Sequence, residues 1–160
     1  MKKSSKLEWK HIDGKSKRRK VDPIAPAGVE PSMKIVTAVA VLLLHEGRVL
    51  SVSRKNDPHD LGLPGGSVER DQNETPEAAA ARELLEETGL VAEDLRLVFE
   101  RPDGEHLVQT FRVMKWSGTI STKETGVVRW VYPSEMLTPG CKSFRDYNRN
   151  LFERLGLDLS

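Results

Sequence analysis

The chain has 160 residues, of which 38% are hydrophobic and 31% are charged, and its net charge is +1. This length and composition are typical of one soluble globular domain with its own core. The longest apolar run, Val36 to Leu44, is far shorter than the ~18 residues that cross a bilayer, which excludes a membrane-spanning helix. No apolar segment of a signal peptide follows the basic N-terminus, and the single cysteine, Cys141, excludes an internal disulfide bond and suits a reducing compartment. We therefore expect a cytoplasmic protein.

The first 33 residues differ in charge from the rest of the chain. Residues 1–20 contain nine Lys or Arg and two acidic residues, a charge of +7, whereas the remainder carries −6. Three prolines and a glycine between residues 23 and 31 are typical of a linker. We predict a basic arm and linker over residues 1–33 and a folded domain over residues 34–160. The arm is able to attract a nucleic acid, but it lacks a series of aromatic side chains for base stacking, so a solubilising tail or a strand-like arm is favoured.

The domain is expected to begin with a β-hairpin. Ile35 to Leu44 is almost continuously apolar, which is typical of a buried strand. Glu46-Gly47 is a turn signal, and Arg48 to Arg54 is the predicted partner strand. Residues 55–62 are predicted to form a polar loop that leads into a glycine-rich turn.

Residues 75–89 carry the signals of one helix, from Pro76 to Thr88. Thr75 is a favourable N-cap, and Pro76 suits the first helical position, where its missing N–H costs nothing. Gly89 suits the position after the last turn, where a left-handed backbone conformation ends many helices.

Three glutamates of this helix, Glu83, Glu86 and Glu87, stand at positions i, i+3 and i+4, so they share an arc of about 100°. Like charges at this spacing repel by about 0.2–0.5 kcal/mol per pair, and a divalent cation held by oxygen ligands offsets that repulsion. Taken alone, such a group is more often a solvated surface, so the interpretation depends on the residues before the helix. The opposite, apolar side is predicted to be buried: Ala78, Ala81, Leu84, Leu85 and Thr88.

A glycine pair precedes the helix, in Pro64-Gly65-Gly66. Adjacent glycines let the backbone turn tightly and approach a ligand closely, because no Cβ intervenes. Arg82 lies beside the carboxylate arc, and we predict that it orients a glutamate through two parallel hydrogen bonds. The alternative for Arg82 is a plain surface cation.

The rest of the chain supplies more strands and a second helix. Asp103-Gly104 is a strong hairpin signal between two β-rich segments, and Gly156 is a helix stop. A mixed sheet between two helices is an α/β/α sandwich, and this α/β (α+β) architecture is our prediction. The expected elements are strands at 95–101, 105–116 and 127–132, a helical turn at 134–136 and a helix at 142–155.

The helix and the residues before it resemble the Nudix box. That motif has a glycine, five residues, a glutamate, seven residues, and then Arg-Glu-apolar-any-Glu-Glu-any-Gly-apolar. Residues 82–90, Arg-Glu-Leu-Leu-Glu-Glu-Thr-Gly-Leu, match the second half at every specified position, and seven residues separate them from Glu74. Between Gly66 and Glu74 there are seven residues instead of five, which we interpret as a polar loop, residues 70–73, enlarged by two. The pattern of strands extends the resemblance to roughly residues 34–155.

The resemblance implies a Nudix-type α/β/α fold and a hydrolase of nucleoside diphosphates linked to another moiety, with Mg²⁺ as cofactor or Mn²⁺ in its place. The metal ligands that it implies are Gly65 or Gly66, through a backbone carbonyl, Glu83, Glu86 and Glu87, with Glu74 hydrogen-bonded near the loop or serving an outer metal. The implied catalytic residues are Glu83, Glu86, Arg82 and Glu124, the last as base or extra ligand, against the alternative of an exposed loop residue. The implied substrate-binding residues are Arg54, Lys55 and Gly66, although Arg54 and Lys55 are equally consistent with a solvated strand end.

The sequence indicates the substrate class less specifically than it indicates the family. A MutT-like nucleoside triphosphate pyrophosphatase is favoured, and the alternatives are an ADP-ribose or nucleotide-sugar pyrophosphatase, an RNA 5′-end pyrophosphohydrolase and a non-catalytic Nudix-fold binding module. Pro102 lies thirteen residues after Gly89, off the place of the proline that marks many ADP-ribose hydrolases. A pure binder gains nothing from three clustered carboxylates. We expect a small nucleotide as substrate and a monomer or homodimer.

Overall fold

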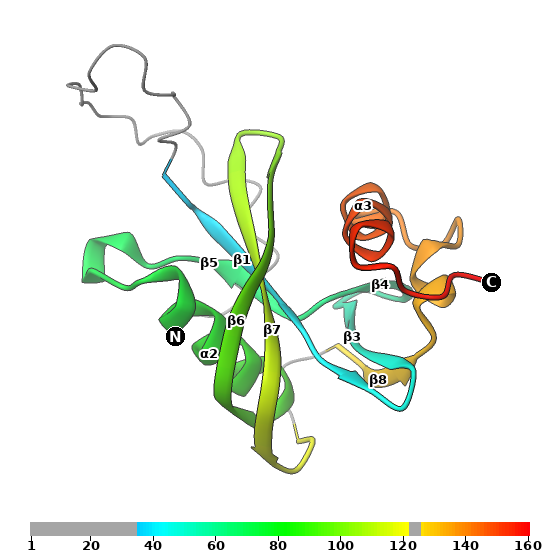
Figure 1. The fold of residues 1–160 in the computed structure, drawn as a ribbon, viewed down its shortest axis with the longest axis horizontal. Coiled ribbons are helices and arrows are strands. Elements are labelled where there is room, and N and C mark those ends of the chain that lie inside the picture. The colour runs from blue at the N-terminus through cyan, green and yellow to red at the C-terminus, as the bar shows by residue number, and fades with distance from the viewer. Residues whose placement is uncertain (1–34, 122–125) are drawn as a thin grey trace.

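The computed structural model describes residues 35–121 and 126–160, which fold into two four-stranded sheets with α-helices packed around them (Figure 1). The predicted basic arm and linker, residues 1–33, lie outside these residues, and so does Glu124.

The first sheet is mixed. Its strand order is β5 (Gly65–Ser67), β1 (Ala38–Leu42), β7 (His106–Gly118), β6 (Leu90–Asp103), and β1 runs parallel to β7 whereas the other neighbours are antiparallel. All five residues of β1 are buried, because the strand lies inside the sheet and is covered on both faces. This explains the nearly continuous apolar run in the sequence, since a strand buried on both faces needs no alternation.

The second sheet is antiparallel. Its central strand is β3 (Arg48–Arg54), which pairs with β2 (Leu44–His45), β4 (Asp57–Gly62) and β8 (Val128–Val131). The turn between β2 and β3 has left-handed backbone angles at Glu46 (φ 53°) and Gly47 (φ 77°), which confirms the predicted hairpin and matches the twist of two antiparallel strands.

Two predictions for this region are wrong. The expected single strand Ile35–Leu44 is divided, because the chain leaves β1 after Leu42 and enters the second sheet as β2. The expected polar loop 55–62 is mostly the strand β4, whose residues Leu61 and Gly62 pair with Ser53 and Val52 of β3. The sequence lacks the pattern of a strand here because Pro58 and His59 are exposed and only the second half of β4 is buried.

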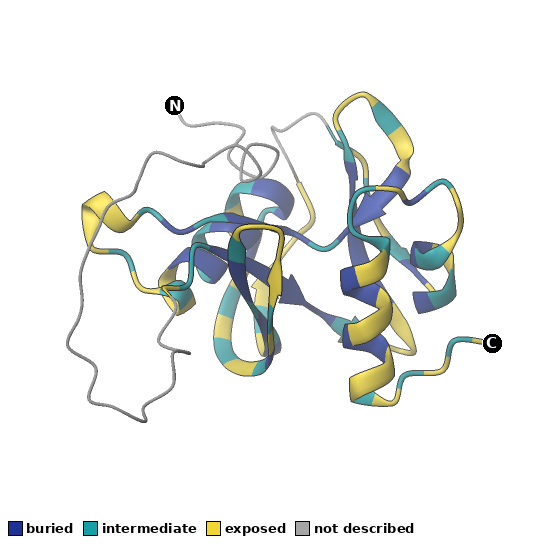
Figure 2. Cartoon of the chain, turned by 90° about the horizontal axis from the view of Figure 1, so that it is seen from above, coloured by how far each residue is buried: buried dark blue, intermediate teal, exposed yellow. Residues whose placement is uncertain are grey.

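The helices α2 (Pro76–Thr88) and α3 (Arg145–Leu155) lie on opposite sides of the first sheet (Figure 1). Odd-numbered residues of β1 pack on the α2 side, and Ala38 and Leu42 pack on the α3 side. In Figure 2 the buried residues line the strands and one side of each helix. The predicted α/β/α sandwich is confirmed. No helix in the described part of the chain is long and apolar enough to cross a membrane.

Short helical turns complete the fold. The predicted turn at 134–136 is the 3₁₀-helix η4 (Pro133–Leu137), and the polar loop at 70–73 contains a second one, η3 (Arg70–Gln72). The hairpin at Asp103-Gly104 is confirmed, but its strands β6 and β7 are longer than predicted. Helix α3 begins at Arg145, three residues later than predicted.

The buried face of α2 differs from the prediction. Leu85 is 51% exposed, and Ala78 is exposed as well, although both were assigned to the apolar face. Glu83 and Glu87 are instead buried, at 1% and 2% exposure. Charged side chains are buried only where partners compensate the lost hydration. The groups around Glu83 and Glu87 therefore determine how these carboxylates are stabilised inside the protein. The buried residues of α2 are Ala79, Ala80, Glu83, Leu84, Glu87 and Thr88.

Candidate active site

The ends of α2 determine which way its glutamates point. The Thr75 hydroxyl accepts a hydrogen bond from the backbone N–H of Ala78 at 3.1 Å, which caps the first turn as predicted. Gly89 ends the helix with a left-handed backbone (φ 84°). With both ends set, Glu83 and Glu87 lie one turn apart on the side that faces the glycine strand β5.

The two glycines of β5 contact these two glutamates. The backbone N–H of Gly65 donates a hydrogen bond to Oε1 of Glu87 at 3.2 Å. A Cβ at Gly66 would lie 2.6 Å from Cδ and 2.9 Å from Oε1 of Glu83, so a side chain has no room there. A Cβ at position 66 would therefore displace the Glu83 carboxylate, and glycine lets the backbone approach it closely.

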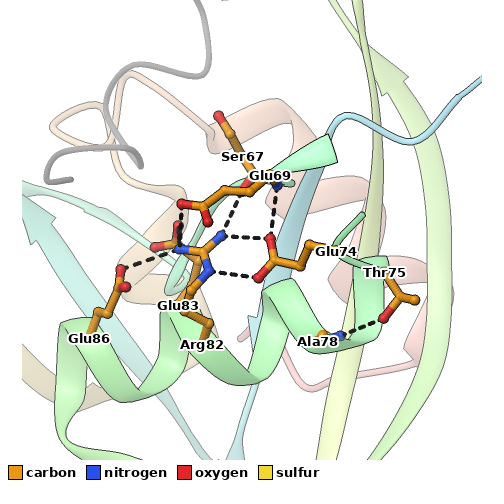
Figure 3. Close-up of polar contacts among 8 residues, drawn as sticks. All are labelled: Ser67, Glu69, Glu74, Thr75, Ala78, Arg82, Glu83 and Glu86. Carbon is orange, nitrogen blue, oxygen red and sulfur yellow. Dashed lines mark hydrogen bonds and ion pairs between the residues drawn. The ribbon is translucent and has the colours of Figure 1, made fainter. Parts of the chain in front are cut away.

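Arg82 makes the bidentate pair that the sequence predicted, and its partner is Glu74 (Figure 3). Its Nε and Nη2 donate to the two carboxylate oxygens of Glu74 at 2.7 and 2.9 Å. Its Nη2 also donates to the carbonyl oxygen of Ser67 at 3.0 Å, and its Nη1 donates to Oε2 of Glu83 at 3.0 Å. Arg82 thus ties α2 to the loop before it, and the alternative of a plain surface cation is excluded.

We call Glu69, Glu74, Glu83 and Glu86 around Arg82 the carboxylate cluster. The Arg82 Nη1 atom lies 3.4 Å from Oε1 of Glu86 and 3.7 Å from Oε2 of Glu69. The sequence analysis did not identify Glu69. Its position three residues after Gly66, directly before the enlarged loop, was the signal available. Glu69 also orients Glu74, because its backbone N–H donates to Oε1 of Glu74 at 2.8 Å.

These contacts change two pKa values. The hydrogen bond to Glu74 raises the pKa of Arg82, and the neighbouring carboxylates Glu83 and Glu69 raise it further against the effect of burial. Burial alone would raise the pKa of Glu74, but hydrogen bonds from Arg82 and from the Glu69 backbone together lower it below its ordinary value. Both groups are therefore held in their charged forms.

The donor chemistry of this region suits a hard divalent cation. The side-chain atoms of the carboxylate cluster that can coordinate a metal ion are carboxylate oxygens, which Mg²⁺ prefers. The Gly66 backbone lies directly against the Glu83 carboxylate. Among residues 35–121 and 126–160, no group of three acidic, His or Cys side chains is already arranged around an ion position. The Arg82 guanidinium instead supplies the positive charge at the centre of the carboxylate cluster. The residues thus fit a hard cation in the chemistry of their carboxylate oxygens.

A second feature, which we call the apolar pocket, opens beside the carboxylate cluster. Gly65 and Glu87 form one wall, and Phe144 and Asn148 come from α3 and the residue before it. Asn148 is 2% exposed, and its Nδ2 has no hydrogen-bond partner within the described structure. Buried amides normally have partners, so a donor without one in the wall of a pocket is a candidate ligand contact. The lining residues are Ala40, Val52, Ser53, Arg54, Gly62, Leu63, Gly65, Glu87, Phe144, Tyr147 and Asn148.

The structure brings most of the predicted site residues together. Arg54 lines the apolar pocket, with its guanidinium carbon 5.8 Å from the ring centroid of Phe144. Lys55 lies in the exposed turn after β3, outside the pocket walls that the structure describes. Phe144 and Asn148 belong to the helix predicted over residues 142–155 and, four residues apart, share one of its faces. A polar residue on that face was the signal of a site.

The family model of the NUDIX domain matches residues 33–155 of this chain. The chain belongs to the Nudix family. It is therefore a Nudix hydrolase, an enzyme that acts on pyrophosphate bonds, and enzymes of this family generally use a divalent metal ion.

Individual relatives of this Nudix hydrolase carry MutT names. A MutT-like protein of Streptomyces ambofaciens is 34% identical over 109 residues, which cover 66% of this chain and 69% of that protein. The 8-oxo-dGTP diphosphatase of Escherichia coli (strain K12) is 30% identical over 105 residues, covering 61% of this chain and 80% of the relative. A MutT Nudix hydrolase of Burkholderia pseudomallei has a similar structure, with a TM-score of 0.60, 25% identity and coverage of 76% and 99% of the two chains.

Proposed function

We propose that this Nudix hydrolase cleaves a nucleoside triphosphate into a nucleoside monophosphate and pyrophosphate, with Mg²⁺ as cofactor and Mn²⁺ able to replace it. One observation carries the proposal. The apolar pocket and the carboxylate cluster adjoin each other, with Glu87 and Gly65 between them. A ligand with an apolar, planar end and a polyanionic end fits that arrangement, and a nucleotide has both.

The apolar pocket suits the nucleobase. The Phe144 ring offers a flat apolar surface, and the Asn148 amide offers a donor at Nδ2. A pocket of this kind binds by apolar contact and obtains its specificity from a few polar groups. The unpartnered donor of Asn148 favours a base with a ring nitrogen or carbonyl acceptor at that edge.

The carboxylate cluster suits the metal end of the substrate. Glu83 of the cluster and the adjoining Glu87 would hold the ion together with the Gly65 carbonyl. Glu86 would be a further ligand or would position the attacking water, and Glu74 would support an outer position. A bound Mg²⁺ neutralises the charge of the polyphosphate and lowers the pKa of a bound water. Arg82 holds Glu83 and Glu74 in place, because its donors contact both carboxylates.

The exposure of the glutamate side chains indicates which of them acts on the attacking water. The Glu86 side chain is 35% exposed, whereas that of Glu83 is 1% exposed. Glu86 is therefore the carboxylate that water reaches most easily, and we assign it the role of positioning the attacking water. Glu124, outside the described residues, is the second candidate for the base. Arg54 faces the phosphate chain from the pocket, and Lys55 approaches it from the adjoining turn.

A panel of phosphate compounds with Mg²⁺ or Mn²⁺ tests the proposal through the identity of the products. The panel contains the ordinary nucleoside triphosphates, 8-oxo-dGTP because of the relative of that name, ADP-ribose, a nucleotide sugar and an RNA with a 5′-triphosphate. We expect monophosphate and pyrophosphate from a nucleoside triphosphate. Preferred turnover of ADP-ribose or of the sugar nucleotide would contradict the proposal.

The RNA substrate needs a control of its own. If RNA ends are the true substrate, removal of residues 1–22 should weaken RNA turnover and flatten its dependence on salt, because basic residues bind the phosphate backbone. We expect the shortened chain to hydrolyse free nucleotides as the full chain does. A loss confined to RNA, together with poor turnover of free nucleotides, would overturn the proposal.

A further inference from the structure

A buried carboxylate lies behind the apolar pocket. Asp60, on β4, is 6% exposed, and none of the roles proposed above uses it. It accepts two hydrogen bonds from Ser143, one from the backbone N–H at 3.1 Å and one from the hydroxyl at 2.6 Å. Ser143 precedes Phe144, the N-cap residue of α3. Asp60 therefore joins β4 to the start of α3.

The chain of hydrogen bonds continues to the pocket. The Ser143 hydroxyl accepts a hydrogen bond from Nη1 of Arg54 at 2.6 Å. A hydroxyl has one proton to donate and lone pairs to accept, so donation to Asp60 leaves the oxygen free to accept from Arg54. The negative charge of Asp60 makes that oxygen a stronger acceptor, because hydrogen bonds in a chain polarise one another.

Arg54 is consequently held from two sides. Its Nη1 is bound by Ser143, and its guanidinium carbon lies 5.8 Å from the Phe144 ring centroid. A long, flexible side chain loses much rotamer freedom on binding an anion. Fixing the side chain in advance removes part of that cost, so the phosphate meets a guanidinium already in position.

We propose that Asp60 and Ser143 are positioning residues, which set the affinity for the nucleotide by holding Arg54 toward the phosphate chain. This inference rests on the proposed function, since it takes the nucleotide as ligand. The competing explanation is that Asp60 and Ser143 only fasten β4 to α3. The two explanations differ in whether the effect of Ser143 depends on Arg54.

A double-mutant cycle on the full chain separates them. Ser143→Ala, Arg54→Ala and the double variant are compared by kcat and KM for the nucleotide with Mg²⁺. We expect Ser143→Ala to raise KM about tenfold, as for a lost hydrogen bond to a charged group, and to leave kcat within about twofold. In the Arg54→Ala background the same substitution should leave KM unchanged. An equal rise in both backgrounds, or no rise in either, would overturn the proposal.

Ser160→Ala is the matched control. Its hydroxyl also donates to an aspartate, Oδ1 of Asp158, at 2.7 Å, but on the exposed C-terminal segment. KM should not change in this variant. Asp60→Asn is a second variant that keeps the side-chain shape, and its smaller rise in KM should likewise vanish without Arg54.

We call the hydrogen bonds from Arg54 through Ser143 to Asp60 the relay. A failure of the relay proposal is distinguishable from a failure of the proposed function. Turnover by the unmodified chain tests the function, and the cycle tests only the dependence of Ser143 on Arg54. If another compound of the panel proves to be the substrate, the cycle is measured with that compound. A dependence on Arg54 then supports the relay, and independent effects overturn it.

Discussion

The carboxylate cluster and the apolar pocket lie side by side, yet they are built in opposite ways. The cluster comes from one stretch of chain, Glu69 to Glu86, and Arg82 within that stretch offsets part of its negative charge. The pocket takes its walls from β1, β3, β4, β5, α2 and α3, and it contains a buried donor, Nδ2 of Asn148, that has no partner among residues 35–121 and 126–160. If the proposed function holds, the reactive chemistry is local in sequence, whereas recognition is assembled from the whole fold. Each of the following changes tests that division.

The largest effect is expected at Glu87, where the two regions meet. Glu87→Gln should lower kcat by about 10³-fold or more, because a metal ligand contributes several kcal/mol to transition-state stabilisation. The fold should survive, since the Gln Oε1 atom still accepts the hydrogen bond from Gly65. The rate of product formation with Mg²⁺ and the melting temperature are both measured for this variant.

Glu77→Gln is the control for this variant, because Glu77 is exposed in the first turn of the same helix. It should retain full activity. Full activity of Glu87→Gln would remove Glu87 from the site.

Gly66→Ala tests the contact between backbone and carboxylate. The new Cβ would lie 2.6 Å from Cδ of Glu83, so the carboxylate must move. We expect an activity loss of about 10²-fold, the cost of misplacing a catalytic group by about 1 Å. Gly104→Ala is the control, because in the described structure no heavy atom lies within 4 Å of its Cβ, although its left-handed φ of 66° costs some stability. If both variants are equally active, the Gly66 contact has no role in the site.

Asn148→Leu tests recognition separately from chemistry. Loss of the amide should raise KM for the nucleotide about tenfold, with kcat less affected. The free energy of unfolding should stay within about 1 kcal/mol of the original or increase, because the Nδ2 donor has no partner to lose in the part of the chain that the structure describes. Steady-state kinetics measures KM and kcat, and chemical denaturation measures the free energy of unfolding.

Asn150→Leu makes the same chemical change on the exposed side of α3, where Nδ2 bonds to the Asp146 carbonyl at 2.7 Å. KM should not change in this control. A large loss of stability in Asn148→Leu alone would show that Asn148 serves packing.

The smallest effect concerns the pH dependence of stability in the metal-free protein. The folded-state pKa of Glu74 lies below its ordinary value of 4.5, so its carboxylate stabilises the fold above that pH, and the contribution is lost as pH falls through the lowered pKa. Glu74→Gln should lower the free energy of unfolding by about 1–2 kcal/mol at pH 7, and the difference should narrow below about pH 4.5.

Denaturation with a chelator present, from pH 7 to pH 3, measures this difference. The same substitution at exposed Glu153 on α3 is the control. A difference that stays constant over the whole range would contradict the pairing of Glu74 with Arg82.

The limits of α2 were predictable because their causes are local. Thr75, Pro76 and Gly89 act through the backbone of their own turn. The bidentate pair of Arg82 was predictable for a similar reason, since its partner lies only eight residues away. The buried face of α2 was not, because burial of Glu83 and Glu87 depends on the glycine strand β5 that packs against them.

The strand β4 and the polar side of the pocket were missed for one physical reason. β4 has an exposed first half, and only its pairing with β3 reveals it as a strand. Asn148 is one polar residue in an amphipathic helix, and nothing near it in sequence marks it as a ligand contact. The relay from Asp60 to Ser143 spans 83 residues, so no local pattern encodes it.

By itself, the sequence determined the helix with its glutamates and the family to which it belongs, because short-range capping and charge spacing decide those features, whereas the predicted glycine-rich turn is the strand β5. Tertiary structure alone decided which carboxylates are buried, which side chains line the apolar pocket and how Arg54 is held. Those features depend on contacts between segments distant in sequence, and such contacts form only when the sheets and both helices pack together.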